Sequence, residues 1–329
     1  MKSLRSEKNR ILKAEFIPSK SRGGCSRQAR TERIYQKIKI QVMQNFFNTN
    51  FQNQIFNNQL TNDGIAQFRS LIWEFYGSNA RTFAWRENIS PYRTVVSEIM
   101  LQQTQTDRVA KKFDQFISKF PTFQDLADAP QADVITAWQG LGYNRRALAL
   151  HKIAQMVVQE HAGMLPNDPK ILQTFPGLGP NTAGSVCAFA YNLPTVFIET
   201  NIRTVFLHHF FRSQDQVHDK LLLPLIEQAV DRENPRHWYY ALMDYGVILK
   251  KEFHNVINHR SKHHAVQSKF EGSERQIRGM ILRLLTQEKQ VTFQVLCQLI
   301  DREPDRIERN LQALCKEGFV QQGNGKFFL

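Results

Sequence analysis

The chain has 329 residues, 42% of them hydrophobic, which is enough for two or three small folded domains. No run of eighteen apolar residues predicts a membrane span, and the charged N-terminus lacks the apolar stretch of a secretory signal. The cysteines have the spacing of neither a metal site nor a disulfide framework; they are Cys25, Cys187, Cys297 and Cys315. We therefore expect a protein that is neither secreted nor membrane-bound and that works in a reducing compartment.

Most of the positive charge lies in the first forty residues. The formal net charge is +13, and residues 1–40 hold twelve Lys or Arg against three Glu, so nine of the thirteen charges belong to this segment. A basic tail explains this charge without a nucleic-acid-binding fold. Residues 41–60 contain eleven Asn or Gln. We expect residues 1–60 to be a disordered tail that buries little core, and translation from Met43 would remove its basic part.

From Asp63 the apolar residues recur at helical spacing, and Asp63 itself can cap the first helix. Further helices are predicted at 95–105, 106–119, 124–127, 132–140, 145–160, 169–174, 182–191, 201–211, 221–230 and 235–249. Gly and Pro mark short turns between them, and no stretch alternates as a strand would. Residues 61–268 are therefore predicted to form an all-α domain of many short helices.

The last segment, residues 270–329, has a different pattern. Three apolar stripes predict three helices, and the sequence FVQQGNGKFFL then predicts two short strands around an Asn324-Gly325 turn. This order is typical of a winged helix-turn-helix, an α module with a small β-hairpin. A packing or dimerisation module is the alternative to DNA contact. Basic residues near the third stripe favour DNA contact; they are Arg302, Arg306, Arg309 and Lys316.

A glycine-rich turn between two predicted helices carries the first functional motif, FPGLGPNTAG at 175–184. Gly177 and Gly179 allow a sharp turn and let backbone N–H groups approach an anion, while the following helix directs its positive end to the same point. Such a hairpin holds a phosphate without reading a base. The alternative is a helix pair that turns on glycines and binds nothing.

An acidic residue follows at the entry to the next helix. Glu199 lies fifteen residues after Gly184, in the stretch VFIETNIR. Departure of a base from DNA develops positive charge on the sugar, which a fixed carboxylate stabilises. The hairpin, the helix and the carboxylate are therefore the parts that N-glycosyl cleavage needs. The structural alternative is that Glu199 only caps the helix that continues through Asn201 and Val205.

From Trp85 to Leu249 the chain resembles the HhH-GPD superfamily of base-excision DNA glycosylases, and within it the adenine glycosylases of the MutY type. The matching segments are AWR (84–86), PY (91–92), SEIMLQQTQ (97–105), GLGY (140–143) and LALHK (148–152), followed by the hairpin. Their order and spacing make chance a poor explanation. The resemblance implies a two-lobed helix-hairpin-helix core.

The resemblance also implies a role for each matched residue. Glu98 would be the general acid/base that protonates a purine leaving group, which requires a pKa above the value of about 4.3 for free Glu. Glu199 would take the position of the family's catalytic aspartate, with Asn201 polarising beside it. Gln103 and Tyr143 would fill the stack left by a flipped base. The remaining DNA contacts are assigned to Arg86, Gln102, Gly177, Gly179, Asn181 and Thr182. The structural alternatives are an exposed helix carboxylate for Glu98 and a packed core phenol for Tyr143.

Two departures from the family pattern affect catalysis. Glu199 replaces the aspartate and shifts the carboxylate by roughly 1.5 Å, and a misplacement of about 1 Å can cost on the order of a hundredfold in rate. Because Glu keeps the charge, we still expect activity. Asn181 stands where bifunctional members have a Schiff-base lysine, so we expect hydrolysis without a lyase step.

Two further departures concern accessory parts. The family has four iron–sulfur cysteines just after the helix that corresponds to 238–249, whereas residues 247–270 contain none. We expect no cluster and no other metal, because the histidines there lack a thiolate or carboxylate to complete a site. A basic loop that contacts phosphates is expected instead. The C-terminal module does not resemble the domain with which many adenine glycosylases inspect 8-oxoguanine.

The sequence thus predicts a monomeric, monofunctional DNA glycosylase of base excision repair. It would act on double-stranded DNA with a mispaired or damaged base, adenine being the expected one, in the cytoplasm at the nucleoid or wherever the cell keeps its DNA. The alternatives are a glycosylase for another lesion or mismatch, and a non-catalytic DNA-binding protein on the same scaffold. Joint retention of Glu98, Gln103 and Tyr143 argues against binding alone.

Overall fold

The computed structural model describes residues 41, 43–264 and 268–329, so the predicted basic tail at 1–40 lies outside the described residues. The chain divides into two units, Met1–Thr49 and Asn50–Leu329. Of the first unit the structure describes a helix over residues 43–48, in which Phe46 and Phe47 are buried. In the described ranges, no helix combines the length and apolar character needed to cross a membrane.

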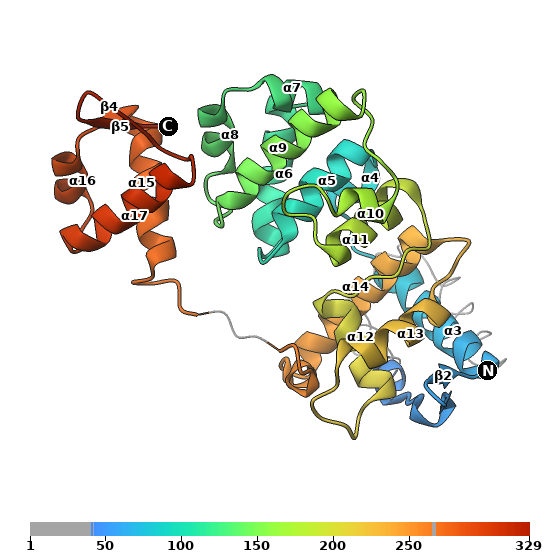
Figure 1. Ribbon diagram of the computed structural model, residues 1–329. Helices are drawn as coiled ribbons and strands as arrows, with labels where there is room; N and C mark the ends of the chain where they lie inside the picture. The colour runs from blue at the N-terminus through green and yellow to red at the C-terminus, as the bar shows by residue number, and fades with distance from the viewer. Residues whose placement is uncertain (1–40, 42, 265–267) are drawn as a thin grey trace, which may run out of the picture. The chain divides into compact units, whose positions relative to one another are not determined.

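The first lobe of the second unit is a bundle of short helices around one core (Figure 1). Its helices are α4 (Ala84–Glu87), α5 (Pro91–Leu101), α6 (Thr106–Lys119), α7 (Phe123–Asp128), α8 (Gln131–Trp138), α9 (Arg145–Glu160), α10 (Pro169–Leu172) and α11 (Pro180–Tyr191). Val96, Phe113 and Trp138 are fully buried at its centre. Helix α5 begins four residues before the predicted start, because the Ser90 hydroxyl caps it and Pro91 occupies its first position.

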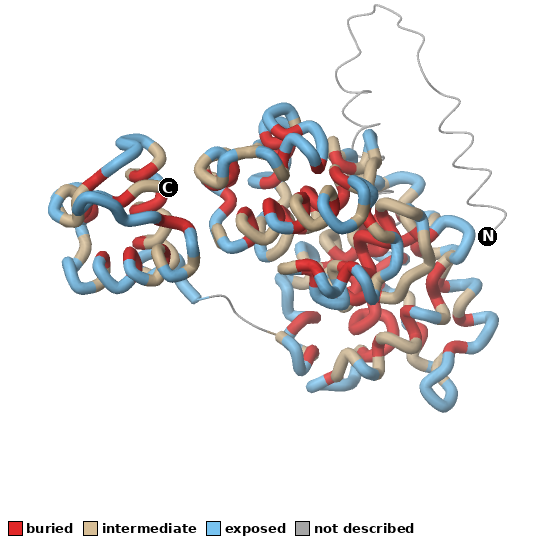
Figure 2. The backbone as a smooth tube through the Cα atoms, turned by 45° about the horizontal axis from the view of Figure 1, so that its top comes forward, coloured by how far each residue is buried: buried red, intermediate tan, exposed pale blue. Residues whose placement is uncertain are grey.

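The second lobe is a helical bundle with an aromatic core. It contains α3 (Asn62–Asn79), α12 (Thr200–Phe210), α13 (Asp219–Ala229), α14 (Pro235–Glu252) and the 3₁₀ helix η2 (Val256–Arg260). The ring of Phe68 packs edge-on against Phe206 at 5.4 Å and Trp238 at 5.9 Å. Helices α12 and α14 approach so closely that a Cβ at Gly246 would lie 2.4 Å from the carbonyl oxygen of Asn201. Figure 2 shows buried residues on the inward sides of these helices.

The C-terminal module is the predicted winged helix with one more strand. Its elements are α15 (Glu274–Glu288), β3 (Gln290–Val291), α16 (Phe293–Leu299), α17 (Pro304–Lys316), β4 (Gln321–Gly323) and β5 (Lys326–Phe328). Asn324 and Gly325 both have positive φ, as the hairpin turn requires. The unpredicted strand β3 pairs with β5, giving the antiparallel order β3-β5-β4. Two residues are too few for an alternating pattern to appear in the sequence.

The expectation that residues 41–60 bury little core is wrong. Phe51 is 2% exposed and packs against Phe68 and Phe210, each 5.7 Å away between ring centroids. After the 3₁₀ helix η1 (Gln52–Gln54), the strands β1 (Ile55–Phe56) and β2 (Gln59–Leu60) form a small hairpin. Low-complexity composition hid this anchor, because a few aromatic residues suffice to bury the segment when a partner surface exists.

We predict that Phe51→Ala lowers the free energy of unfolding by about 3 to 5 kcal/mol, the usual cost of removing a buried Phe side chain. Phe56 lies five residues away and is 73% exposed, so Phe56→Ala is the matched control and should change stability little. Urea unfolding followed by circular dichroism measures both variants. Equal stability of the two would restore the disordered-tail interpretation.

Candidate active site

The predicted glycine turn is a helix-hairpin-helix between α10 and α11. Gly177 has φ +79°, and Gly179 is the N-cap of α11 without a side-chain cap, while Pro180 occupies the first helical position. Among the described residues, the N–H groups of Gly177, Gly179 and Thr182 donate to no protein acceptor. Free N–H groups at a helix N-terminus are suited to an anion such as a phosphate.

Two side chains connect this hairpin to its surroundings. Gln102, just after α5, donates from Nε2 to the Gly177 carbonyl at 3.0 Å and lies 3.3 Å from the Thr182 hydroxyl. Asn181 accepts the N–H of Ile198 through Oδ1 at 3.1 Å. Asn181 therefore ties the hairpin to the residue immediately before Glu199. Gln102 and Asn181, two of the predicted DNA contacts, therefore hold the hairpin in position.

Glu199 caps α12, and its carboxylate is fixed by the first residues of that helix. Oε1 accepts the N–H of Ile202 at 2.7 Å, and Oε2 accepts Nδ2 of Asn201 at 3.0 Å. Asn201 keeps Oδ1 buried without a hydrogen-bond partner in the described structure. Capping does not exclude catalysis, because each carboxylate oxygen has a second lone-pair site. Burial lowers the pKa of Lys250, whose ammonium is stabilised in part by the Glu199 carboxylate.

Glu98 lies on α5 at the face turned toward α11. The carboxyl Oε2 is in hydrogen-bond contact with the Ser185 hydroxyl, which is also 3.0 Å from the Thr182 carbonyl oxygen. The pKa of Glu98 is raised to about 7, mainly by burial and to a smaller extent by the Glu199 charge, while the Ser185 hydrogen bond and the Arg86 charge oppose the rise. When Glu98 is protonated, its O–H can donate to Ser185 while Ser185 donates to the Thr182 carbonyl.

A small pocket adjoins Glu98. It is lined by Trp85, Arg86, Thr94, Ser97, Glu98, Leu101, Phe189, Tyr240 and Met243. Its volume of about 20 Å³ holds roughly one water molecule, so a base can enter only if the side chains around it move apart. A flat aromatic and apolar lining with one carboxyl is suited to a heterocyclic ring.

Arg86 forms one wall of this pocket and is held rigidly. Its guanidinium donates to both oxygens of Asp244, at 2.9 and 3.0 Å, and lies 4.2 Å from the centroid of the Tyr240 ring. Asp244 is 1% exposed and also accepts Nε of Arg81 at 2.7 Å. The sequence prediction assigned Arg86 to DNA contact; the structure shows it satisfied by Asp244 and Tyr240, facing the pocket.

The two predicted wedge residues occupy neighbouring loops of strained conformation. Gln103 and Tyr143 have φ of +54° and +47°, which is uncommon for residues other than glycine. Arg146 is buried between the loops and donates to the carbonyls of Ile99, Met100, Gln102, Leu141 and Gly142 and to the Thr104 hydroxyl. One guanidinium thus donates hydrogen bonds to the carbonyl groups at the end of α5 and to those of the turn before Tyr143.

Sequence reasoning missed Ser185, Arg146, Asp244 and Tyr240. All four are polar or aromatic side chains on helices, where the sequence gives no sign that they face another element. The only available signal was the position of Arg146 directly after Arg145 at the start of an apolar helical stripe, where one of two neighbouring residues can fall on the buried face.

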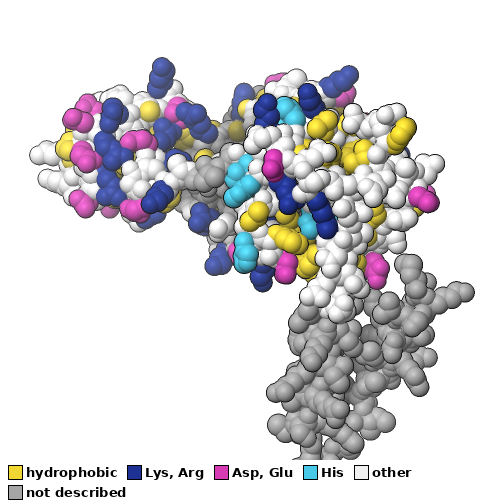
Figure 3. Space-filling model, turned by 90° about the horizontal axis from the view of Figure 1, so that it is seen from below, with side chains coloured by type: hydrophobic (Ala, Val, Ile, Leu, Met, Phe, Trp, Pro, Cys, Tyr) yellow, Lys and Arg dark blue, Asp and Glu magenta, His cyan; other side chains and the backbone are white. Residues whose placement is uncertain are grey.

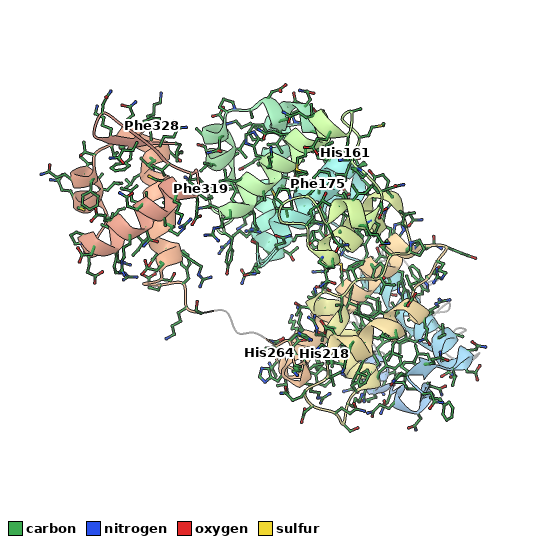
Figure 4. All side chains as sticks on the ribbon, in the orientation of Figure 1. His161, Phe175, His218, His264, Phe319 and Phe328 are labelled. Atoms are coloured by element: carbon green, nitrogen blue, oxygen red, sulfur yellow. The ribbon has the colours of Figure 1, made fainter. Side chains whose placement is uncertain are left out.

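The residues after α14 do not fit an iron–sulfur cluster. Of the described cysteines, Cys187 is buried on α11, and Cys297 and Cys315 belong to the C-terminal module. That segment has histidines instead: His259 pairs with His264 at a ring distance of 4.6 Å, and His263 pairs with His218, the N-cap of α13, at 4.5 Å. Figure 4 marks His218 and His264. In the described part of the chain no three His, Cys, Asp or Glu residues form a metal-binding group.

A larger cavity of about 240 Å³ lies in the second lobe and shares no lining residue with the pocket beside Glu98. It is lined by Gln52, Ile55, Asn58, Phe210, Phe211, Gln214, Leu221 and Leu225. No ionisable side chain borders it, so acid–base chemistry has no group to use there. The small pocket beside Glu98 is therefore the candidate active site.

Comparisons with known proteins show what the chain is similar to. Residues 96–226 match the family model of the HhH-GPD superfamily base excision DNA repair protein. The chain is 31% identical over 183 residues to an adenine DNA glycosylase of Buchnera aphidicola subsp. Baizongia pistaciae, covering 55% of this chain and 52% of that protein. It is 40% identical over 142 residues to one of Mycobacterium tuberculosis, covering 43% and 46%. The chain spans about half the length of these curated relatives.

A solved structure titled as a thermostable thymine-DNA glycosylase is similar in fold. It superposes with a TM-score of 0.52 at 27% identity, covering 57% of this chain and 88% of that chain. The similarity supports the all-α two-lobed fold predicted from the sequence.

The raised pKa of Glu98 generates a prediction about stability. A carboxyl whose folded pKa lies above its unfolded value stabilises the fold at low pH and loses that contribution as the pH rises from about 4.5 to about 7. Glu98→Gln removes the ionisation, so it should be more stable than wild type by on the order of 3 kcal/mol at pH 8 and nearly equal at pH 4.

Glu74→Gln is the matched control, because Glu74 is an exposed residue of α3. Urea unfolding at both pH values measures the difference. A Glu98→Gln variant that is no more stable than wild type at pH 8 would show that Glu98 ionises normally.

Proposed function

We propose that this protein is a base-excision DNA glycosylase that hydrolyses the N-glycosidic bond of a flipped base, because residues 96–226 match the HhH-GPD superfamily model. The observation that carries the proposal is the pair of carboxyls with different environments. Glu98 is enclosed and has a raised pKa, whereas Glu199 is fixed as a carboxylate acceptor by Ile202 and Asn201. Two carboxyls whose environments differ in this way are suited to separate acid and electrostatic roles.

In this mechanism Glu98 donates its proton to a ring nitrogen of the base, which leaves as a neutral molecule. Ser185 holds the carboxyl in place during the transfer. The Glu199 carboxylate stabilises the positive charge that develops on the sugar as the bond breaks. Water then adds to the sugar, and its proton passes to the Glu98 carboxylate, which restores the starting state.

We further propose adenine as the base. The relatives named adenine DNA glycosylase and the enclosed acid support a purine, because purines leave readily when protonated. Thymine in a mismatch is the second candidate, favoured by the likeness to the thymine-DNA glycosylase structure. The non-catalytic alternative has less support, since binding alone does not require a carboxyl with a raised pKa.

Double-stranded DNA is the proposed partner, held by the hairpin amides at Gly177 and Gly179 and by the wedge residues Gln103 and Tyr143. We propose that the protein acts as a monomer, at the nucleoid or wherever the cell keeps its DNA. We also propose that it works without an iron–sulfur cluster, because residues 247–270 offer no thiolate.

The carboxylate variants test the mechanism. Glu98→Gln should reduce base release by about 100-fold or more, most strongly for purines, because the proton donor is lost. Glu199→Gln should reduce it by about 100- to 1,000-fold for any base, because the charge facing the sugar is lost. Single-turnover assays on a panel of duplexes with single lesions and mismatches measure base release. Alkali then breaks the strand at each abasic site that base release has left.

Glu199→Asp separates the two interpretations of the longer side chain. Asp caps helices well, so this variant should fold normally. It should lose activity if the pocket is built for Glu, and gain activity if Glu199 is a damaged form of the aspartate position. Glu74→Gln is again the control, and all variants should bind duplex DNA like wild type. A wild type that is inert on the whole panel, with Glu199→Asp equally inert and binding intact, would establish the non-catalytic alternative.

The reaction type gives a separate prediction. Asn181 is occupied with the Ile198 N–H and cannot form an imine, so borohydride should trap no protein–DNA adduct during base release. Strand breaks should appear only after alkali or an added endonuclease. Efficient trapping would contradict hydrolysis by water and point to a lysine such as Lys250.

A further inference from the structure

The C-terminal module contacts the first lobe through the α8–α9 hairpin. Ile135 of α8 belongs to the buried core of the module, and Leu148 of α9 packs against the same core. Gln139 donates from Nε2 to the Thr286 hydroxyl at 2.8 Å and to the Leu282 carbonyl at 3.1 Å. The module therefore shares both apolar and polar contacts with the loop-bearing hairpin of the core.

A bridging carboxylate adds to this contact. Glu317, at the end of α17, accepts hydrogen bonds from Arg145 of the core at 2.7 and 2.9 Å and from Arg278 of the module at 2.6 and 3.1 Å. The two guanidinium groups hold the pKa of Glu317 well below its usual value. This pairing lies two residues from Tyr143.

One side chain of the module reaches Tyr143 itself. Arg275, in the first turn of α15, donates from Nη1 to the Tyr143 hydroxyl at 2.6 Å. Its Nη2 donates to the Ser268 carbonyl at 2.7 Å, so the guanidinium is anchored from the other side. The ring of Tyr143 also lies 5.5 Å from the guanidinium of Arg146, the residue that fixes the loops.

Two of the four basic residues expected to contact DNA, Arg302 and Arg306, are engaged within the module. Arg302 lies before α17 and pairs with Glu271 at 3.1 Å, and Arg306 pairs with Glu274 at 2.6 Å. Figure 3 shows Lys and Arg interspersed with Asp and Glu on this module. The direct contact of the module with a residue of the proposed DNA site is the hydrogen bond from Arg275 to Tyr143.

We propose that Arg275 is a positioning residue for Tyr143, so that the C-terminal module takes part in opening the DNA duplex. This inference rests on the proposed function, in which Tyr143 enters the base stack. A tyrosine held by its hydroxyl before DNA arrives needs less ordering when it inserts. The module thereby contributes to recognition of a disrupted base pair through the core's own wedge.

The test uses the full chain and a duplex that contains a tetrahydrofuran abasic analogue with 2-aminopurine beside it. Fluorescence anisotropy gives the affinity relative to an intact matched duplex, and 2-aminopurine emission reports unstacking by the wedge. Arg275→Ala should lower the preference for the abasic duplex about tenfold, the equivalent of one charge-assisted hydrogen bond. Arg283→Ala, an exposed arginine on the same helix, should leave it unchanged.

Two further variants separate positioning from general damage. Tyr143→Phe removes only the hydroxyl, and its effect should not add to that of Arg275→Ala, because both remove the same hydrogen bond. Arg275→Lys keeps a hydrogen-bond donor and should restore part of the preference for the abasic duplex. It also replaces Arg275→Ala in the test if that variant does not fold. Additive effects, or an Arg275→Ala variant that behaves like Arg283→Ala, would overturn the inference.

These readouts need no base release. A wild type that prefers and unstacks the abasic duplex but releases no base would refute the proposed activity and leave the role of Arg275 supported. Normal base release with no effect of Arg275→Ala on preference or emission would refute the role of Arg275 alone.

Discussion

Exclusion of water from one carboxyl, that of Glu98, is the constraint on which the site depends. A carboxyl in water gives up its proton near pH 4 and cannot act as an acid at neutral pH. Helices α5, α11 and α14 surround Glu98 with Ser185, Phe189 and Tyr240, and burial raises its pKa to about 7. The same enclosure makes the pocket too small for a base at rest. In the proposed mechanism, catalysis and base entry therefore depend on movement of the same side chains.

Close packing joins the segment that carries Glu199 to both lobes of the fold. Glu98 lies on α5 in the first lobe, and Glu199 is the N-cap of α12 in the second lobe. A Cβ at Gly184 would lie 2.9 Å from the Phe197 Cβ, and one at Gly246 would lie 2.4 Å from the Asn201 carbonyl oxygen, so the segment around Glu199 packs closely against both lobes. Asn181 adds a hydrogen bond across the same junction. Two glycines and one amide thus hold the segment that carries Glu199 against both lobes.

The sequence predicted those parts of the site that are local in the chain. The hairpin at Gly177 and Gly179, the cap at Glu199 and the Asn324-Gly325 turn each depend on a few neighbouring residues, and each has the conformation expected. The enclosure of Glu98 could not be predicted in this way, because Ser185 and Tyr240 come from helices 87 and 142 positions later. The inward direction of Arg146 and the burial of Phe51 likewise depend on partners distant in sequence. The ion pairs of Arg302 with Glu271 and of Arg306 with Glu274 could not be predicted either, because the partners lie about thirty residues away in the sequence.

The pKa of Glu98 itself is the most direct test of this account. Protein labelled with ¹³C at the Glu side-chain carboxyl carbon can be titrated by NMR, with Glu98→Gln used to assign the signal. The account predicts a midpoint near pH 7, well above that of the exposed glutamates. A midpoint near pH 4.5 would contradict it, because Glu98 would then be fully ionised at neutral pH and unable to protonate a departing base.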